Sequence, residues 1–334
     1  MYSFAVIGAG VIGLSAATAI QEHIPSATVT IYSEKLSPEI TSNVAAGMWA
    51  PYLYQRTDAG KILEWGKGTH DQLLKLWKAG YANEAGICLQ FVKSLSEGVD
   101  VYIGENIVYG EHPMPVEEVE FMSKLFNKKF KTAVNYVSFT CEPSKYLPFL
   151  HKQFVHNGGR IVLKKINDFE ELSHYDLVVN CTGLGAPLLT GDTKMTPIRG
   201  TVSRVVAPWQ FHSVMEDDIY IILNMENAVL GTTSQFGDYD TTVREVETKN
   251  INHYCQNLVP SLENAELIKT NVGLRPGRVE VRLETEIRSL KGKQTAIVHN
   301  YGHGGCGVTL SYGCALNVVQ LVRAALNIPQ QSKL

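Results

Sequence analysis

The chain has few cysteines and no paired cysteine motif. Its six cysteines are spread over 334 residues, with no CxxC pair and no histidines at metal-ligand spacing. This excludes a small disulfide scaffold and gives no sign of a zinc centre, so we expect no metal site. We expect the cysteines to be reduced, mostly buried thiols of an intracellular protein.

The chain also lacks a strong charge of either sign and any apolar run that approaches the length of a membrane span. Its formal net charge is −3, with 30 Lys and Arg scattered among 33 Asp and Glu. No basic stretch precedes the first apolar residues, so no secretory signal is predicted. We therefore expect binding neither to nucleic acid nor to a membrane.

Glycine is placed where a nucleotide motif needs it. Residues 4–15 read FAVIGAGVIGLS, which predicts an apolar strand, the turn Gly8-x-Gly10-x-x-Gly13 and the start of a helix. A second strand is predicted over 27–32, and Glu34 follows where an acidic residue would take ribose hydroxyls. A glycine turn packed for structural reasons alone is the alternative. The complete order of strand, turn, helix, strand and acid favours dinucleotide binding.

A second glycine-rich stretch lies near the other end of the chain. Residues 297–315 read IVHNYGHGGCGVTLSYGCA, with five glycines after a β-branched run. Backbone without side chains can bring N–H groups close to a ligand. Cys306 lies inside this stretch. It is either a reactive thiol or simply a small residue that fits the available space, and the second case is more common.

The order of predicted elements indicates a discontinuous organisation with room for two packed cores. Helical spacing covers residues 60–98, and strand signals mix with prolines over 99–120. A helix at 146–154 and strands at 159–163 and 176–180 follow, then antiparallel strands over 201–233 and a helix around 250–258. Residues 271–284 are expected to be extended, 296–300 a strand and 309–326 a closing helix. We predict a nucleotide domain of residues 1–55, 136–200 and 272–330, a substrate domain of 56–135 and 201–271, and a tail of 331–334.

Six sequence blocks together resemble one family. They are GAGVIGLS, TSNVAAGMWAPYL at 41–53, VVNCTGLG at 178–185, RGTVSRVVAPW at 199–209, GLRPGR at 273–278 and the stretch 297–315. In this order they are similar to the D-amino-acid oxidase and D-aspartate oxidase family. The resemblance implies an α/β protein with non-covalently bound FAD. Its fold would be a doubly wound, Rossmann-like FAD-binding domain with an inserted mixed α+β substrate domain.

The same resemblance assigns residues to the cofactor. The pyrophosphate would lie over the first glycine turn, the ribose near Glu34 and Lys35, and the flavin against the second glycine stretch, whose helix start offers N–H donors and a positive dipole end. The implied contacts are Gly8, Ala9, Gly10, Val11, Ile12, Gly13, Glu34, Lys35, Thr41, Ser42, Ala46, Gly47, Met48, Ile166, Thr182, Gly304, Gly305, Gly307, Val308 and Thr309. For Ile166 and Thr182, ordinary packing at a strand end is an equal alternative.

Three residues are implied for the substrate. Arg275 and Tyr220 would bind the α-carboxylate, and the carbonyl of Gly305 would receive the amine. A guanidinium suits this role because its planar fork matches a carboxylate and stays charged. Arg278 and Arg282 are the nearby alternatives to Arg275.

The implied reaction is the oxidation of a D-amino acid by dioxygen to a 2-oxo acid, ammonia and hydrogen peroxide. His299 and His303 flank Tyr301 like a catalytic pair, yet the family gives them no such role, and structural histidines are more common. No base is required if the amine binds neutral, because the α-hydrogen then passes as hydride and orientation supplies the catalysis.

The substrate side chain is less clearly indicated. Enzymes for neutral substrates have a longer loop with an additional tyrosine before the Tyr220 position, whereas here the loop is short. D-aspartate oxidases place basic groups at positions that align near Ser213 and Ser234, and a serine at Gly305. This chain has neither the basic groups nor the serine at these positions, which favours neutral D-amino acids such as D-alanine or D-methionine. The short loop and the segments CEPSKYLPFL and GLGAPLLTGDTKMTPIRG favour the alternative, an acidic substrate bound with help from His212 or Arg56.

Two other functions share part of this pattern, a nicotinamide-dependent dehydrogenase and a non-catalytic flavin-binding protein. The dehydrogenase leaves the second glycine stretch unexplained. It also leaves unexplained the last three residues, Ser332, Lys333 and Leu334, which match the address read by the peroxisomal import receptor. We therefore expect a location in the peroxisomal matrix.

Overall fold

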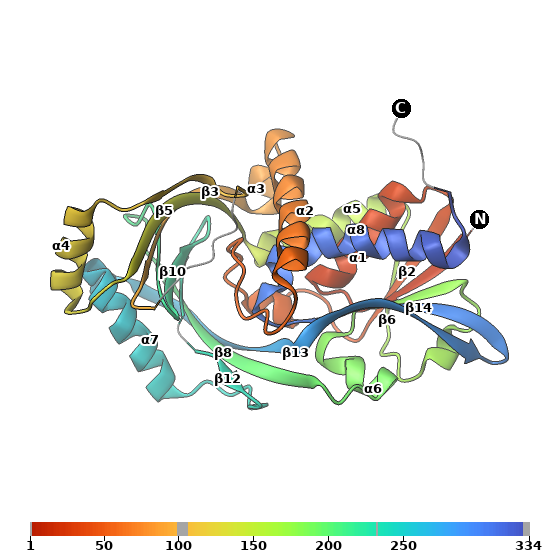
Figure 1. Cartoon of the computed structure of the whole chain (residues 1–334). Helices are drawn as coiled ribbons and strands as arrows, with labels where there is room; N and C mark the ends of the chain where they lie inside the picture. Colours follow the sequence, from red (N-terminus) through yellow and green to blue (C-terminus); the bar gives the residue numbers. More distant parts are fainter. Residues whose placement is uncertain (1, 99–105, 232, 330–334) are drawn as a thin grey trace.

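A computed structural model describes residues 2–98, 106–231 and 233–329. Within them a single sheet of 14 strands runs the length of the molecule, in the order β4-β5-β3-β9-β10-β11-β8-β13-β14-β7-β1-β2-β6, with β12 beside β8. Figure 1 shows the sheet with helices packed over it. The fold class expected from the sequence, α/β with a nucleotide-binding sheet, is confirmed.

One end of the sheet is parallel. Its strands are β14 (Lys293–His303), β7 (Leu177–Asn180), β1 (Tyr2–Ile7), β2 (Ala27–Ser33) and β6 (Arg160–Leu163). The central strands β1 and β7 are almost continuous apolar runs, as expected for parallel strands covered on both faces.

Helices cover one face of this parallel part. They are α1 (Val11–His23), α5 (Pro143–His156) and α8 (Gly307–Leu326), with α2 (Ala59–Lys78) packed across α8. The other face is closed by η2 (Phe169–Leu172), η3 (Gly183–Gly185) and α6 (Ala186–Thr190). Ile7, Phe169 and Ile297 belong to the apolar cluster beneath them.

The other end of the sheet is mainly antiparallel. Its strands are β3 (Ile87–Ser96), β4 (Tyr109–Pro113), β5 (Thr132–Cys141), β8 (Met195–Val206), β9 (Ser213–Glu216), β10 (Ile219–Leu223), β11 (Ala228–Gly231) and β12 (Gln235–Phe236). The strand β3 also joins β9 in a parallel pairing. Around this part lie α3 (Ala82–Ala85), α4 (Val116–Phe126), α7 (Glu245–Leu258) and η4 (Pro260–Asn264).

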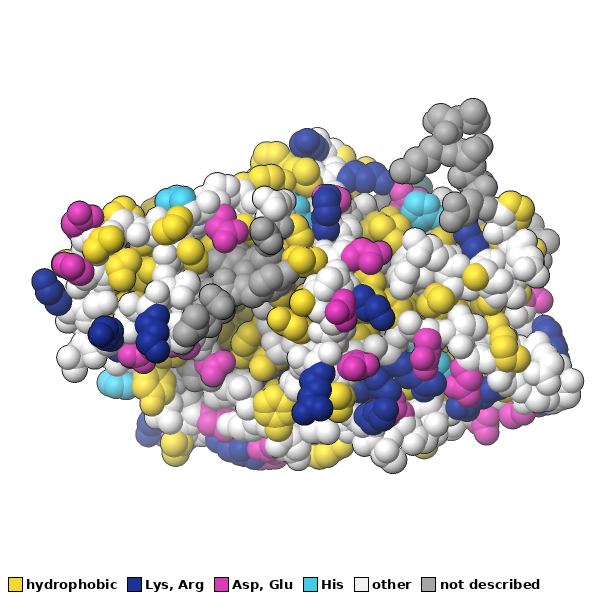
Figure 2. Space-filling view, viewed as in Figure 1, with side chains coloured by type: hydrophobic (Ala, Val, Ile, Leu, Met, Phe, Trp, Pro, Cys, Tyr) yellow, Lys and Arg dark blue, Asp and Glu magenta, His cyan; other side chains and the backbone are white. Residues whose placement is uncertain are grey.

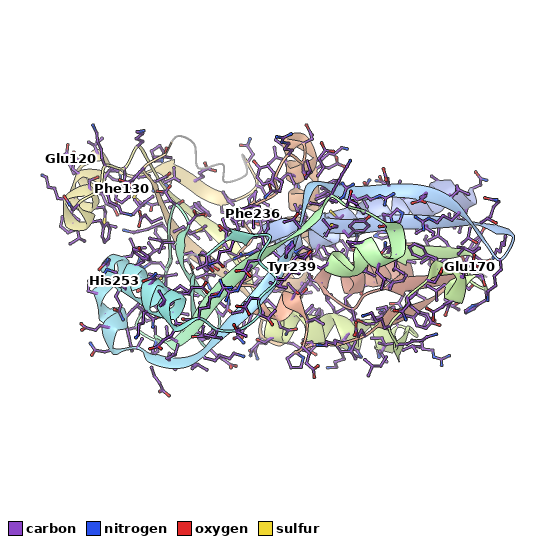
Figure 3. The ribbon with its side chains drawn as sticks, turned by 90° about the horizontal axis from the view of Figure 1, so that it is seen from below. Glu120, Phe130, Glu170, Phe236, Tyr239 and His253 are labelled. Carbon is purple, nitrogen blue, oxygen red and sulfur yellow. The ribbon has the colours of Figure 1, made fainter. Side chains whose placement is uncertain are left out.

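One long strand, β13 (Glu266–Leu290), connects the two parts of the sheet. It pairs with β8 from Glu266 to Arg278 and with β14 at Gly277 and from Arg282 to Leu290. The pairing with β14 is irregular between Gly277 and Arg282. Figure 1 shows this strand near the middle of the molecule. Phe130 and Glu170, labelled in Figure 3, lie toward the two opposite ends of the molecule.

Two sequence expectations need correction. The helical pattern over 60–98 ends early. The helix α2 ends at Lys78, close to Gly80 with its left-handed φ of 87°, and the short α3 ends at Ala85, before Gly86 with a φ of 67°. Residues 87–96 then form β3, paired with β5 along its whole length. A segment with α8 at its core, Gly304–Leu326, is long and apolar enough to cross a membrane, contrary to the expectation that no run approaches that length. Of the most apolar window, 61% is buried inside the fold. Burial within the protein explains this apolar character.

Charged side chains show no large patch of one sign on the face in Figure 2, where basic and acidic groups are interspersed. The predicted boundaries between the nucleotide domain and the substrate domain fall within one continuous sheet, and the division into two domains stays a prediction. Part of the predicted strand region, residues 99–105, and the tail 331–334 lie outside the described residues.

Candidate functional site

A close turn links β1 to α1. Gly8 has a φ of 108°, and a Cβ there would lie 2.5 Å from the carbonyl oxygen of Cys181. A Cβ on Gly13 would lie 1.9 Å from the carbonyl oxygen of Gly8. Only glycine therefore lets the helix cross the strand this closely. The turn is further fixed by the hydroxyls of Ser33 and Ser42, which accept hydrogen bonds from the Ala9 and Val11 N–H groups at 3.2 and 3.1 Å.

This turn opens onto a cavity of about 490 Å³. Its wall includes the first residues of α1 and of α8, so two helix N-termini with their positive dipole ends meet one space. All but two of the predicted site residues line it, namely Gly8, Ala9, Gly10, Val11, Ile12, Glu34, Lys35, Thr41, Ser42, Ala46, Gly47, Met48, Ile166, Thr182, Tyr220, Arg275, Gly304, Gly305, Gly307 and Val308.

The two exceptions, Gly13 and Thr309, support the cavity without lining it. Gly13 allows the close crossing of helix and strand. The Thr309 hydroxyl donates to the carbonyl of Ala50 at 2.9 Å and accepts from its N–H at 3.3 Å. It thereby ties α8 to the segment that contains Met48. Neither residue lines the cavity.

The antiparallel sheet contributes the other end of the same cavity. Tyr220 on β10 faces Gly231 on β11, and a Cβ on Gly231 would lie 2.3 Å from the Tyr220 hydroxyl. Arg275 on β13 lies beside Gly200 on β8, where a Cβ would be 2.2 Å from a guanidinium nitrogen. These two glycines leave the space that the side chains of Tyr220 and Arg275 occupy. Burial raises the pKa of Tyr220, while the adjacent Arg275, which hydrogen bonds to it, opposes that shift.

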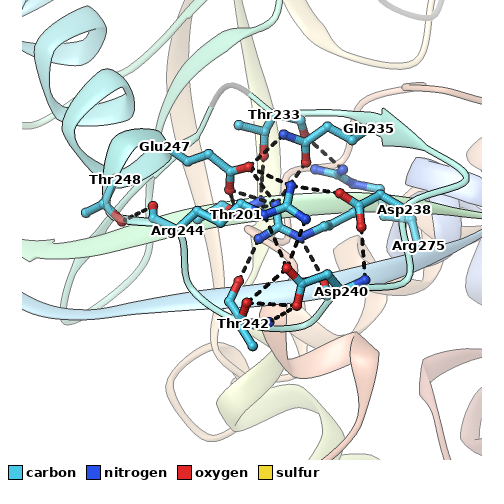
Figure 4. Close-up of polar contacts among 11 residues, drawn as sticks. Thr201, Thr233, Gln235, Asp238, Asp240, Thr242, Arg244, Glu247, Thr248 and Arg275 are labelled. Carbon is cyan, nitrogen blue, oxygen red and sulfur yellow. Dashed lines mark hydrogen bonds and ion pairs between the residues drawn. The ribbon is translucent and has the colours of Figure 1, made fainter.

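A largely buried polar network holds Arg275 (Figure 4). Its NH1 donates to the Thr233 carbonyl at 3.0 Å, and the Thr233 hydroxyl accepts from the Thr201 N–H at 2.6 Å. Thr201 in turn donates to Glu247, which pairs with the fully buried Arg199 at 2.7 Å. Arg275 is therefore positioned by groups that are themselves fixed, a condition for binding a carboxylate in one geometry.

Tyr52 completes this end of the cavity and was missed as a site residue by the sequence reasoning. The Arg275 guanidinium lies 5.9 Å from the centre of its ring, and burial raises the pKa of Tyr52 to about 12. The Cys306 thiol donates to the Tyr52 carbonyl at 2.8 Å and accepts from its N–H at 2.9 Å. The only signal for Tyr52 was its position in the block at 41–53.

Cys306 itself matches the structural interpretation rather than the reactive one. It is fully buried, and burial raises its pKa to about 12. A thiol with a high pKa is mostly protonated and a poor nucleophile at neutral pH. Its role in the structure is to hold the backbone of Tyr52.

The two histidines of the second glycine stretch differ from each other. His299 is satisfied, because Asn180 contacts its Nδ1 at 3.2 Å and Glu286 its Nε2 at 3.0 Å, and it does not line the cavity. His303 lines the cavity, and among the described residues its Nε2 has no hydrogen-bond partner. Burial lowers the pKa of His303 to about 3, so its ring is neutral at neutral pH.

The other positions considered for binding the substrate's carboxylate or side chain do not line the cavity. Ser213 is buried and bonded to Gln90, while His212 packs against Phe91. Arg56 is exposed. Arg278 and Arg282, the alternatives to Arg275, bind Asp192 and Glu284 and do not line the cavity.

The residues fit a large polar cofactor such as FAD. The amide oxygen and nitrogen of Asn300, fully buried in the cavity wall, have no partner among the described residues, and the same holds for Nε2 of His303. Buried polar atoms are usually paired, so such atoms in a cavity wall indicate a ligand with donors and acceptors. A volume of 490 Å³ also lies within the usual range of about 300 to 1,000 Å³ for cofactor and ligand sites.

Known proteins support this interpretation. The chain is 37% identical over 327 residues to a D-aspartate oxidase of Homo sapiens, covering 95% of this chain and 94% of that protein. It is 36% identical to a D-amino acid oxidase of Dugesia ryukyuensis, covering 95% and 96%. A glycine oxidase structure from Geobacillus kaustophilus has the same fold, with a TM-score of 0.78 and 18% identity over 100% of both chains. A family model described as FAD dependent oxidoreductase matches residues 3–321, from the first strand to the closing helix, and the chain therefore belongs to this family, with FAD as its cofactor.

Proposed function

We propose that this protein is an oxidase that deaminates D-amino acids, using FAD bound without a covalent link and dioxygen as the final acceptor. The observation that carries the proposal is the position of Arg275 and Tyr220 at one end of the cavity whose other end is the glycine turn after β1. Relatives named D-aspartate oxidase and D-amino acid oxidase, each matched over 95% of this chain, support it.

The chain's own residues bind and orient the substrate. The Arg275 guanidinium takes the α-carboxylate, with the Tyr220 hydroxyl as a second donor. The carbonyl of Gly305 receives the amine. The Tyr52 ring, with its centre 5.9 Å from the guanidinium, stabilises the positive charge as a cation–π partner.

No side chain has to remove the α-proton as a base. FAD supplies the acceptor for the α-hydrogen and its electron pair. The imine product then takes up water to give a 2-oxo acid and ammonia, and dioxygen is reduced to hydrogen peroxide. His303 is neutral at neutral pH and is available as a hydrogen-bonding group rather than as a charge.

The test is the colour of the purified protein. Anaerobic addition of D-alanine should bleach the flavin absorbance, and L-alanine should not, because only one enantiomer places its α-hydrogen toward the flavin with its carboxylate on Arg275. A yellow protein that no D-amino acid bleaches is a flavin-binding protein without this activity. A colourless protein that binds nicotinamide nucleotides contradicts the proposal entirely.

For the side chain we favour neutral D-amino acids such as D-alanine and D-methionine. In support, Arg275 is the one cation among the described residues that line the antiparallel end of the cavity, and a buried second carboxylate needs a partner. The 37% identity to a D-aspartate oxidase favours the acidic alternative. Comparing kcat/KM for D-alanine, D-methionine, D-glutamate and D-aspartate decides between them.

We also propose import into the peroxisomal matrix by a receptor that reads Ser332, Lys333 and Leu334. The proposal rests on the sequence Ser-Lys-Leu and on the chemistry, since a compartment that removes hydrogen peroxide suits an oxidase. A fluorescent fusion at the N-terminus should co-localise with a peroxisomal marker and become diffuse when these three residues are deleted. Equal distribution of both fusions would disprove it.

A further inference from the structure

Among the residues that the structure describes, two charged side chains belong to the part of the cavity wall formed by the antiparallel sheet. Arg275 is one, and its guanidinium is assigned to the α-carboxylate. The other is Asp217, at the tip of the hairpin formed by β9 and β10. Met215, Tyr220 and Ile222 of the same two strands line the cavity next to it, and Met215 pairs directly with Tyr220. Asp217 therefore belongs to the part of the wall that lies next to the two residues assigned to the substrate, Tyr220 and Arg275.

Asp217 is held in place. Its carboxylate accepts hydrogen bonds from the Ser96 hydroxyl and, at 3.3 Å, from the Glu97 N–H, and its own N–H donates to Leu95. Its backbone adopts a left-handed φ of 47°, a conformation that Asp and Asn tolerate better than most residues. The negative charge is thus a fixed part of the wall.

The groups around Asp217 add negative charge. Asp218, the next residue, accepts a hydrogen bond from the Tyr52 hydroxyl at 3.5 Å. Glu97 and Glu216 bring carboxylate oxygens within 4.8 Å of that of Asp217. Lys128 is paired with Glu216, and Arg275 is directed at the Thr233 carbonyl and Tyr220. A second carboxylate would meet an excess of negative charge here.

The opposite wall leaves no space for an added polar group. A Cβ on Gly305 would lie 2.7 Å from both Cδ1 and the carbonyl oxygen of Tyr52. A side chain at position 305 would therefore collide with the segment that covers Arg275. Asp217 is thus the charged group of this part of the wall, among the described residues, that is not already assigned to the α-carboxylate.

We propose that Asp217 sets the charge preference of the substrate pocket, so that D-amino acids with anionic side chains are rejected and neutral or cationic ones are accepted. This rests on the proposed oxidation of D-amino acids and specifies its substrate class. Asp217 is exposed as well as in the cavity wall, and a hydrogen-bonded carboxylate there repels a like charge and attracts an amine or guanidine, an effect that salt screens.

The experiment compares substrates that differ in charge but not in size. D-aspartate and D-asparagine are such a pair, and D-lysine provides the opposite charge. We expect the wild type to use D-asparagine and D-lysine better than D-aspartate. Asp217→Asn should raise the D-aspartate to D-asparagine ratio of kcat/KM roughly tenfold and lower the D-lysine to D-asparagine ratio similarly. Asp71→Asn, an exposed carboxylate on α2 paired with Lys67, is the matched control and should leave both ratios unchanged.

A second measurement needs no variant. Raising the ionic strength from about 20 mM to about 500 mM should increase the D-aspartate to D-asparagine ratio of the wild type, because salt screens the repulsion. Unchanged ratios in Asp217→Asn, no response to salt, or a wild type that prefers D-aspartate each overturn this inference. Flavin bleaching by any D-amino acid shows that the proposed function itself holds in those cases, and its absence with every substrate overturns both.

Discussion

At the scale of single residues, Arg275 has the clearest expected effect. Arg275→Leu should retain the flavin absorbance and lose kcat/KM for D-alanine by roughly 150- to 5,000-fold, since an unpaired substrate carboxylate costs about 3 to 5 kcal/mol. Arg56→Leu, an exposed arginine outside the cavity, is the control and should keep its activity. Steady-state kinetics with peroxide detection measure both. Near-normal turnover in Arg275→Leu would contradict the assignment.

Asn300 should contribute to cofactor affinity. Its buried amide lines the cavity, and neither polar atom has a partner among the residues that the structure describes. Asn300→Leu should raise the Kd for FAD by roughly 5- to 30-fold, because about 1 to 2 kcal/mol of hydrogen bonding is lost. Asn252→Leu is the matched control, since the amide oxygen of Asn252 is buried and unpaired within the described residues, but on α7 and away from the cavity. Flavin fluorescence titration gives both values, and equal Kd values would disprove the role.

At the scale of elements, α2 and α8 cross where Gly68 meets Gly313. A Cβ on Gly313 would lie 1.9 Å from the carbonyl oxygen of Trp65 on α2, so the two helices would have to move apart. Gly313→Ala should therefore destabilise the protein by about 1 to 3 kcal/mol or more. Ala324→Ser, at an exposed position of the same helix, is the control and should change stability by less than about 0.5 kcal/mol. Urea unfolding at saturating FAD tests the pair, and equal midpoints would contradict the close crossing.

The strand β14 contains two buried histidines, His299 and His303, that make stability depend on pH. Burial lowers the pKa of His299 to about 4, and it lowers the pKa of His303, His70 and His212 as well. Above pH ~6.5 the folded and unfolded forms of these rings are both neutral. As the pH falls from ~6.5 toward 4, the unfolded chain binds protons that the folded chain does not, so the free energy of unfolding decreases.

Thermal unfolding in a fixed excess of FAD should therefore show a lower Tm at pH 5 than at pH 7.5, with a shallower dependence in His299→Gln. The contribution of His299 is on the order of 3 kcal/mol across its full window, from pH ~6.5 to about 4. A Tm that stays constant over this range would show that the buried rings are protonated in the folded protein.

At the scale of the whole molecule, the predictable features were local in sequence. The turn from Gly8 to Gly13 could be predicted because its strand, glycines and helix are contiguous. The strands β3 and β5 could not, because their pairing joins segments about 45 residues apart and neither has a strong pattern of its own. Residues 87–96 instead continued a helical spacing.

The substrate end depends even more on distant contacts. The local sequence around Arg275, an arginine before a proline on a strand, does not predict a binding role. Only the family resemblance indicated one. Its place in the cavity depends on Gly200 and Thr233 from other strands. Tyr52 and Asn300 lie inside family blocks, but nothing in those blocks distinguishes them from their neighbours, and Asp217 lies in no block. The importance of all three comes from the cavity that they share.

The long strand β13 has a consequence for how a substrate enters. Bending two bodies about a hinge requires a connection that few hydrogen bonds cross, whereas β13 is bonded to β8 on one side and to β14 on the other. Rotation of the two halves would break these ladders during every turnover. Entry and product release must therefore come from small movements of side chains and turns at the cavity rim, and the rate of those movements would set an upper limit on turnover.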